Sequence, residues 1–138
     1  MEIKQISVFL ENTRGRLSKV TQTLAQAGIN LRAISIADTA DFGILRFIVD
    51  KTDEAVAALN GAGFTVKLTD VIAVEIDDVP GSLAKLMEIV QVSNVNIEYL
   101  YATLENKSGK AVVIFRMENH EQGLKLIRES GLTLIESF

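Results

Sequence analysis

The chain has 138 residues, of which 48% are hydrophobic and 23% charged, a composition typical of a folded protein rather than a disordered one. Cysteine is absent, which excludes disulfides, cysteine-based zinc sites and thiol nucleophiles. The net charge is −4 and no basic run is interleaved with aromatic residues, so nucleic acid is not an expected partner.

The N-terminal segment MEIKQISVFLEN carries charges where a signal peptide needs an apolar core. The longest uninterrupted apolar runs, such as Ala111 to Phe115, are far shorter than the roughly 18 residues that a membrane span needs. We therefore expect a cytoplasmic protein with no membrane partner.

The first half of the chain predicts six elements of secondary structure. In chain order they are a strand over about 3–10, a helix, two strands over about 29–38 and 43–50, a second helix and a short final strand. The first helix is expected because apolar residues recur there at intervals of three and four, at Leu17, Val20, Leu24 and Ala27. Gly28 ends this helix, and the turn-forming ADTADFG separates the two strands. Thr52 is expected to cap the second helix and Gly63 to close it.

The second half repeats this pattern. Its elements are a strand over about 71–77, a helix, two strands over about 95–105 and 110–118, and a helix between the cap Asn119 and the closing Gly131. The halves align at an offset of 66 residues and then, after a two-residue insertion, at 68. Matched pairs include Asn12 with Asp78, Gly15 with Gly81, Asn30 with Asn96, Phe47 with Phe115 and Phe64 with Leu132. The chain is therefore interpreted as a duplication.

The order βαββαβ, occurring twice, predicts an α+β protein of two ferredoxin-like repeats. In each repeat the helices are expected on one face of an antiparallel sheet, and the domains are expected over 1–69 and 70–138. Apolar residues alternate onto both faces of the third strand of each repeat, for example Phe47 and Ile48. Tyr99 and Tyr101 fall on a strand expected at a sheet edge. These features predict that the protein is a homodimer.

Two short motifs recur at matched positions. The first half has NTRGRL at 12–17 and GINL at 28–31, and the second half has DVPGSL at 78–83 and NVNI at 94–97. In both halves 15 residues separate the loop glycine from the strand asparagine. With these motifs the chain resembles the ACT-domain family of amino-acid-sensing regulatory modules, as two tandem copies that cover nearly its whole length. One departure is Arg14, which stands where the family has proline.

The resemblance implies that each loop between the first strand and the first helix binds a small amino acid. Backbone N–H groups and the helix dipole suit the ligand carboxylate, and a side-chain oxygen of Asn12 or Asp78 suits its ammonium group. Asn30 or Asn96 is expected to reach the ligand from a neighbouring half or chain. The candidate ligand-binding residues are Asn12, Arg14, Gly15, Arg16, Leu17 and Asn30 in the first half, and Asp78, Gly81, Ser82, Leu83 and Asn96 in the second. The first loop is favoured because two arginines flank its glycine.

Simpler interpretations exist for the same residues. Asn12 and Asp78 are also suited to capping the first helix of each repeat, and the loop glycines to a turn conformation. Glu75, Asp77 and Asp78 form an acidic cluster that helix capping and strand-end exposure explain without a metal ion.

The resemblance predicts a non-catalytic regulatory protein that binds an amino acid, needs no cofactor and acts on a partner, for example an enzyme of amino-acid metabolism. One alternative is an acylphosphatase-like enzyme on the same fold, because such enzymes also carry an arginine in the loop after the first strand. The other is a protein-interaction module without a ligand.

Overall fold

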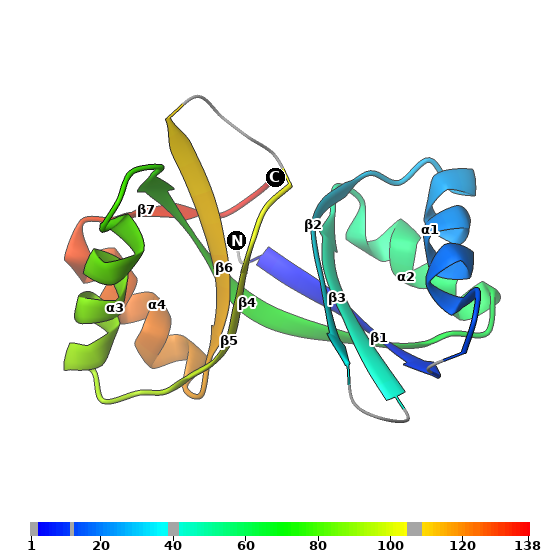
Figure 1. The fold of residues 1–138 in the computed structure, drawn as a ribbon, viewed down its shortest axis with the longest axis horizontal. Helices are drawn as coiled ribbons and strands as arrows, with labels where there is room; N and C mark the ends of the chain where they lie inside the picture. Colours follow the sequence, from blue (N-terminus) through cyan, green and yellow to red (C-terminus); the bar gives the residue numbers. More distant parts are fainter. Residues whose placement is uncertain (1–2, 12, 39–41, 105–108) are drawn as a thin grey trace. The chain divides into compact units, whose positions relative to one another are not determined.

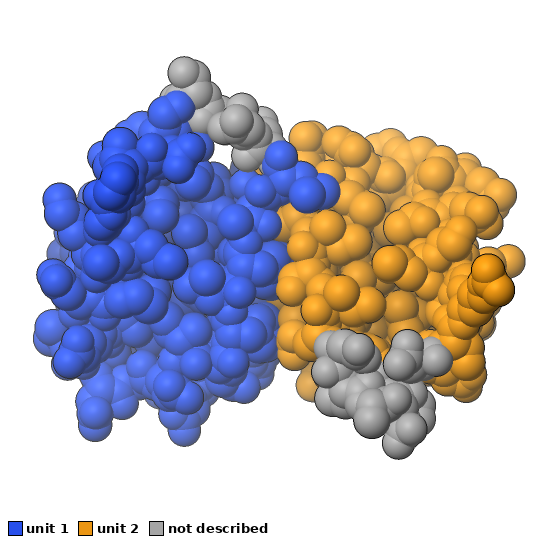
Figure 2. Space-filling view, in the orientation of Figure 1, with its two compact units in different colours: residues 1–3, 70–137 blue, residues 4–69, 138 orange. Residues whose placement is uncertain are grey.

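The computed structural model describes residues 3–11, 13–38, 42–104 and 109–138. These residues divide into two compact units, Lys4–Thr69 and Asp70–Ser137, with Ile3 assigned to the second and Phe138 to the first (Figure 2). We call them the N-terminal and the C-terminal unit, and each is described by itself.

The N-terminal unit follows the order βαββα, completed by the start of β4. Its elements are β1 (Ile3–Glu11), α1 (Arg16–Gln26), β2 (Leu31–Asp38), β3 (Phe42–Val49), α2 (Thr52–Gly61) and the first residues of β4 (Thr65–Asp77). The strand order is β2-β3-β1 with β4 next to β1, and β1 and β2 both pair antiparallel with β3. Both helices cover the same face of the sheet (Figure 1).

The C-terminal unit repeats this arrangement. The rest of β4 is followed by α3 (Ser82–Val92), β5 (Ile97–Ala102), β6 (Lys110–Met117), α4 (His120–Ser130) and β7 (Thr133–Ile135). The order is β5-β6-β4-β7, all antiparallel, and α3 and α4 lie on one face (Figure 1). The predicted fold class, two ferredoxin-like repeats with antiparallel sheets and helices on one face, is confirmed.

The strand register shows the duplication directly. Ile6 of β1 pairs with Phe47 of β3, and the matched residues Ile72 and Phe115 pair in the same way between β4 and β6. All four side chains are fully buried, and each pair belongs to the hydrophobic core of its own unit. Since burying a side chain of this size is worth about 1.5–3 kcal/mol, these positions fix which face of each sheet receives the helices.

Most of the helix ends predicted from the sequence are confirmed, and one is wrong. Gly28 and Gly63 follow α1 and α2 with positive φ, and Asn94, which follows α3, has φ +58°. The side chain of Asn119 accepts a 3.1 Å hydrogen bond from the N–H of Gln122 and so caps α4 as predicted. The prediction for Thr52 is wrong, because Lys51 holds the N-cap position of α2 and makes no side-chain cap.

β4 corrects another expectation. The predicted final strand of the first repeat and the predicted strand over 71–77 form one continuous strand of 13 residues. Its residues Thr65–Thr69 belong to the N-terminal unit and its remaining residues to the C-terminal unit.

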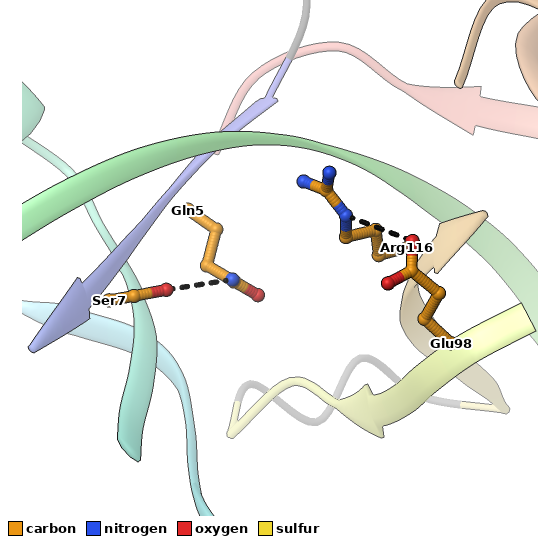
Figure 3. A network of polar contacts seen from close by, with 4 residues as sticks. All are labelled: Gln5, Ser7, Glu98 and Arg116. Carbon is orange, nitrogen blue, oxygen red and sulfur yellow. Dashed lines mark hydrogen bonds and ion pairs between the residues drawn. The ribbon is translucent and has the colours of Figure 1, made fainter. Parts of the chain in front are cut away.

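Apolar residues on the sheet face away from the helices differ in exposure, and Phe9 of β1 on this face is 43% exposed. Ile48 of β3 is 2% exposed and Ile114 of β6 is fully buried. In the same face of β1, the side-chain amide of Gln5 donates a 3.2 Å hydrogen bond to the hydroxyl of Ser7 (Figure 3). The homodimer predicted from the apolar sheet faces stays a prediction.

β5 lies at the end of the strand order, as predicted for the strand that carries Tyr99 and Tyr101. Nε of Arg116 in β6 donates a 3.3 Å hydrogen bond to the carboxylate of Glu98 in β5 (Figure 3). Both side chains are more than a third exposed, so this ion pair is worth at most about 1 kcal/mol. Among the described residues, β5 is thus an edge strand of the sheet.

Candidate functional site

Each predicted ligand-binding loop connects a strand to a helix through a glycine. Gly15 precedes α1 with φ +87° and Gly81 precedes α3 with φ +90°, and each occupies the N-cap position. This left-handed conformation is costly for any residue with a Cβ, so both glycines are required by the backbone. The N–H groups of Arg16 and Ser82 donate back to the carbonyls of Thr13 and Val79. The next N–H groups of each helix face the loop without an acceptor in their own helix.

Glycines hold the N-cap positions of these helices, in place of the residues that the sequence suggests as caps. Neither Gly15 nor Gly81 is accompanied by a side-chain cap. Asp78 is exposed, and its N–H donates a 3.0 Å hydrogen bond to the carbonyl of Gly109. Asn12 lies outside the described residues.

The strand asparagines lie far from the loops of their own repeats. Asn30 follows α1 and Asn96 follows α3, whereas the loop glycines precede these helices. Eleven helical residues span about 16 Å. Asn30 and Asn96 are exposed, and their backbones are bonded to the strand beside them. The carbonyl of Asn30 accepts from the N–H of Asp50, and that of Asn96 accepts from the N–H of Glu118. A ligand that touches a loop therefore cannot also reach the asparagine of the same repeat.

The two arginines of the first loop, Arg14 and Arg16, differ in their exposure to solvent. Arg14 is exposed, whereas the guanidinium of Arg16 lies over the ring of Phe64, 5.0 Å from its centroid. Nε of Arg16 is buried without a hydrogen-bond partner, and Phe64 is 5% exposed. The Arg16 side chain therefore packs against Phe64 within the N-terminal unit.

Leu17 and Leu83, both predicted as ligand-binding residues, are 44% and 43% exposed in the first turn of α1 and α3. The buried residues of the two helices are Val20 and Leu24, and Leu86 and Val90.

The second loop forms one wall of a pocket of about 260 Å³ that lies wholly in the C-terminal unit. Val79, Pro80 and Ser82 line it from the loop and the start of α3. Leu132, just beyond α4, and Leu86 of α3 contribute apolar surface. Of the predicted site residues, the pocket includes Ser82; Asp78, Gly81, Leu83 and Asn96 are not among its lining residues.

Four charged residues surround this pocket, namely Glu75 and Asp77 at the end of β4, Lys85 of α3 and Lys110 at the start of β6. The ammonium group of Lys110 forms an ion pair and hydrogen bond with the carboxylate of Asp77. This hydrogen bond and the charge of Lys110 lower the pKa of Asp77, and the charge of Lys85 lowers it further. The hydrogen bond and charge of Asp77, together with the charge of Glu75, raise the pKa of Lys110. The lining therefore has two positive and two negative side chains.

Sequence reasoning did not select Lys85 or Lys110, and it considered Glu75 and Asp77 only for a metal ion. In the residues that the structure describes, no group of three histidine or acidic side chains is placed to hold a metal ion. The same residues include no helix long and apolar enough to cross a membrane.

Comparisons with known proteins agree with the geometry. The sequence profile of the family described as an ACT domain pair matches residues 1–137. A search of curated proteins finds no match to this chain. Among solved structures, protein BT0572 from Bacteroides thetaiotaomicron is 41% identical, with a TM-score of 0.91 over 98% of this chain and 92% of that one.

Two regulatory subunits share the fold at lower identity. The ligand-free regulatory subunit of aspartate kinase from Thermus thermophilus is 25% identical, with a TM-score of 0.69 over 95% of this chain and 94% of that one. The regulatory subunit of aspartate kinase from Thermus flavus is 22% identical, with a TM-score of 0.63 over 94% and 93%.

Proposed function

The chain belongs to the family of ACT domain pairs, and from this premise we propose that it is a non-catalytic regulatory protein that binds a small amino acid and acts on a partner protein. The likeness to the aspartate kinase regulatory subunit from Thermus thermophilus, which extends over 94% of that chain, supports a regulatory role. The partner is an enzyme of amino-acid metabolism in this proposal.

The observation that carries the proposal is the strand-to-helix loop that occurs twice with the same backbone. In both copies a glycine with φ near +90° leaves the N-terminal turn of a helix open to the loop. Such a turn favours a carboxylate through its free N–H groups and its dipole. By their place in the motif, Asn12 and Asp78 offer an oxygen atom to the ammonium group of the ligand.

Asn30 and Asn96 take part from a neighbouring ACT domain in this proposal. Each lies about 16 Å from the loop of its own repeat, so a contact with the ligand has to come from another domain, in this chain or in a second copy. The position of β5 at the end of the strand order makes it the strand proposed to take part in such an assembly. We therefore also propose a homodimer, which light scattering tests; a single-chain mass at micromolar concentration, with and without amino acids, would contradict it.

Thermal unfolding in the presence of each proteinogenic amino acid tests the function. A metabolite sensor needs a Kd between about 1 μM and 1 mM, and a ligand at about 100 times its Kd stabilises the folded state by roughly 2.7 kcal/mol. At least one amino acid is therefore expected to raise the melting temperature clearly. If none does at millimolar concentration, the proposed function is wrong.

Substitution of the asparagines tests their role. Loss of one buried hydrogen bond costs about 1–3 kcal/mol, so Asn30→Ala or Asn96→Ala should weaken binding by roughly 5-fold to 150-fold. Lys125→Ala, an exposed change on α4, should leave the affinity unchanged. Parental affinity in both asparagine variants would remove these residues from the site while leaving the regulatory function standing.

A further inference from the structure

The last two residues of α2 are a pair with its own covalent chemistry. Asn60 is followed by Gly61, whereas every other asparagine of the chain precedes a residue with a side chain. Asparagine is thermolabile because the backbone nitrogen of the next residue can attack its side-chain amide. Glycine obstructs this attack least, since it has no Cβ and its backbone is the most mobile. Asn60 therefore has the least hindered nitrogen after it of all the asparagines in the chain.

Both residues of the pair are open to solvent. Asn60 and Gly61 are exposed, and a Cβ atom added to Gly61 would meet no other part of the fold within 4 Å. Water can thus reach the side-chain amide of Asn60, and no packed neighbour obstructs a rearrangement of the backbone around Gly61.

The end of the helix opposes the attack. The Asn60 backbone has to leave the helical conformation before the nitrogen of Gly61 can turn toward Cγ of Asn60. Two hydrogen bonds hold this end closed, from the N–H of Gly63 to the carbonyl of Asn60 and from the N–H of Phe64 to the carbonyl of Leu59, both 3.0 Å. Helix ends open locally more often than whole domains unfold, so opening of this one turn is sufficient to expose the pair.

We propose that Asn60 is a site of spontaneous deamidation, and that local opening of the C-terminal end of α2 sets the rate. In the opened turn the nitrogen of Gly61 loses its proton to solvent and bonds to Cγ of Asn60. The bond from Cγ to the amide nitrogen breaks, ammonia leaves with a proton from solvent, and a succinimide ring remains. Water then opens the ring at one of its two carbonyls and gives aspartate or isoaspartate. Overall one water is consumed and one ammonia is released, and nothing is oxidised or reduced.

The product suits this helix end less well than asparagine does. α2 has no basic residue in its last turn, so a new carboxylate at position 60 lies at the negative end of the helix dipole without a compensating charge. At the position that matches Asn60, α4 carries Arg128, whose charge has the favourable sign. Isoaspartate also displaces the carbonyl that accepts from Gly63. Deamidation therefore makes the net charge more negative than −4 and loosens the end of α2 irreversibly.

Peptide mapping by mass spectrometry, after incubation of the full chain at mildly alkaline pH, tests the proposal. The peptide that contains Asn60 should gain about 1 Da before any peptide that contains another asparagine. In the chain unfolded by urea the same peptide should react faster, because the helix end no longer restrains it. Gly61→Ala should largely stop the reaction, since a Cβ hinders the attacking nitrogen.

Gly63→Ala distinguishes local opening from unfolding of the whole chain. A φ of +88° is costly for alanine, so the closed helix end is destabilised and the reaction should accelerate by roughly 5-fold to 30-fold. Gly131→Ala is the matched control, because Gly131 follows α4 with φ +81° and a Cβ there also meets no atom within 4 Å. It strains the other unit in the same way and should leave the rate at Asn60 unchanged.

Circular dichroism checks that these variants fold. Phe64→Leu, which takes the residue found at the matched Leu132, loosens the same helix end more gently and should also accelerate the reaction. Equal acceleration by Gly63→Ala and Gly131→Ala would assign the reaction to global unfolding and overturn the proposal. An unchanged rate in both Gly63→Ala and Phe64→Leu, or faster deamidation at another asparagine, would overturn it as well.

Discussion

Gly123 of α4 faces the sheet of the C-terminal unit at a point where no space remains for a side chain. A Cβ atom on Gly123 would lie 2.6 Å from Sδ of Met117 and 2.9 Å from Cδ1 of Ile72, both fully or nearly fully buried. In the N-terminal repeat the counterparts of Gly123 and Met117 are Ala55 and Val49. In the C-terminal unit the smaller helix residue, Gly123, faces the larger strand residue, Met117. In the N-terminal unit the helix residue is larger, Ala55, and the strand residue is smaller, Val49.

Gly123→Ala is expected to destabilise the fold although alanine is the better helix former. Replacing glycine by alanine in a helix interior gains about 1 kcal/mol, whereas overpacking a core costs about 1–3 kcal/mol. The free energy of unfolding should therefore fall by about 0–2 kcal/mol. In a Met117→Val background the contact with Sδ is removed while that with Cδ1 of Ile72 remains, so Gly123→Ala should destabilise the fold less than in the parent. The expected coupling between the two changes is about 1–3 kcal/mol.

Urea unfolding followed by circular dichroism, applied to the parent, both single variants and the double variant, measures this coupling. Gly61→Ala is the control, because a Cβ at Gly61 meets no atom within 4 Å, and it should stabilise the fold by up to about 1 kcal/mol. A coupling below about 0.3 kcal/mol, or equal stabilisation by Gly123→Ala and Gly61→Ala, would refute the packing argument.

Three further predictions concern helix ends and the charged pocket. Asn119→Ala should lower the free energy of unfolding by about 1 kcal/mol in urea titrations, because it removes the acceptor of the Gln122 N–H. Asn94→Gly should raise it by a few tenths of a kcal/mol, since glycine tolerates φ +58° better, and unchanged or lower stability would contradict this. Lys110→Ala should raise the pKa of Asp77 toward its ordinary 3.8 in an NMR titration, because Lys110 is the main cause that lowers it. In the parent, the stability from this ion pair should be present above pH 3.8 and be lost as the pH falls through the lower pKa of folded Asp77. The Lys110 pKa is raised above 10.5, so the same pair should lose its effect again at pH above that value.

Matched apolar and glycine positions made the fold predictable from the sequence. Phe47 and Phe115 carry the alternation of the third strand in each repeat, and the structure buries both in the same place. The continuity of β4 from one unit into the next was harder to predict, because domain boundaries usually fall in flexible linkers. The segment Thr65–Asp77 contains no glycine, proline or asparagine that would interrupt a strand, and this was the available signal.

The pocket was not predictable from matched positions because it depends on mismatched ones. Aligning Ser82 with Arg16 and Leu132 with Phe64 shows the loss of side-chain volume. The alignment does not show that the two positions line the same pocket, which depends on how the helices return over the sheet. Lys110 could not be assigned either, since its ion pair with Asp77 joins residues 33 positions apart in the chain.

In a duplicated chain, comparison of the two repeats distinguishes residues that the fold needs from residues that serve a function. Positions that keep the same residue type in both repeats, such as Phe47 and Phe115, hold the two cores, so truncating them should cost stability in either unit alike. Positions that differ between the repeats, such as Ser82, are not required for the fold, because the same fold accepts Arg16 at the matched position. A change at Ser82 that removes ligand binding without lowering stability would therefore act on the ligand site and not on the fold. The two repeats consequently define which substitutions distinguish a loss of ligand from a loss of structure.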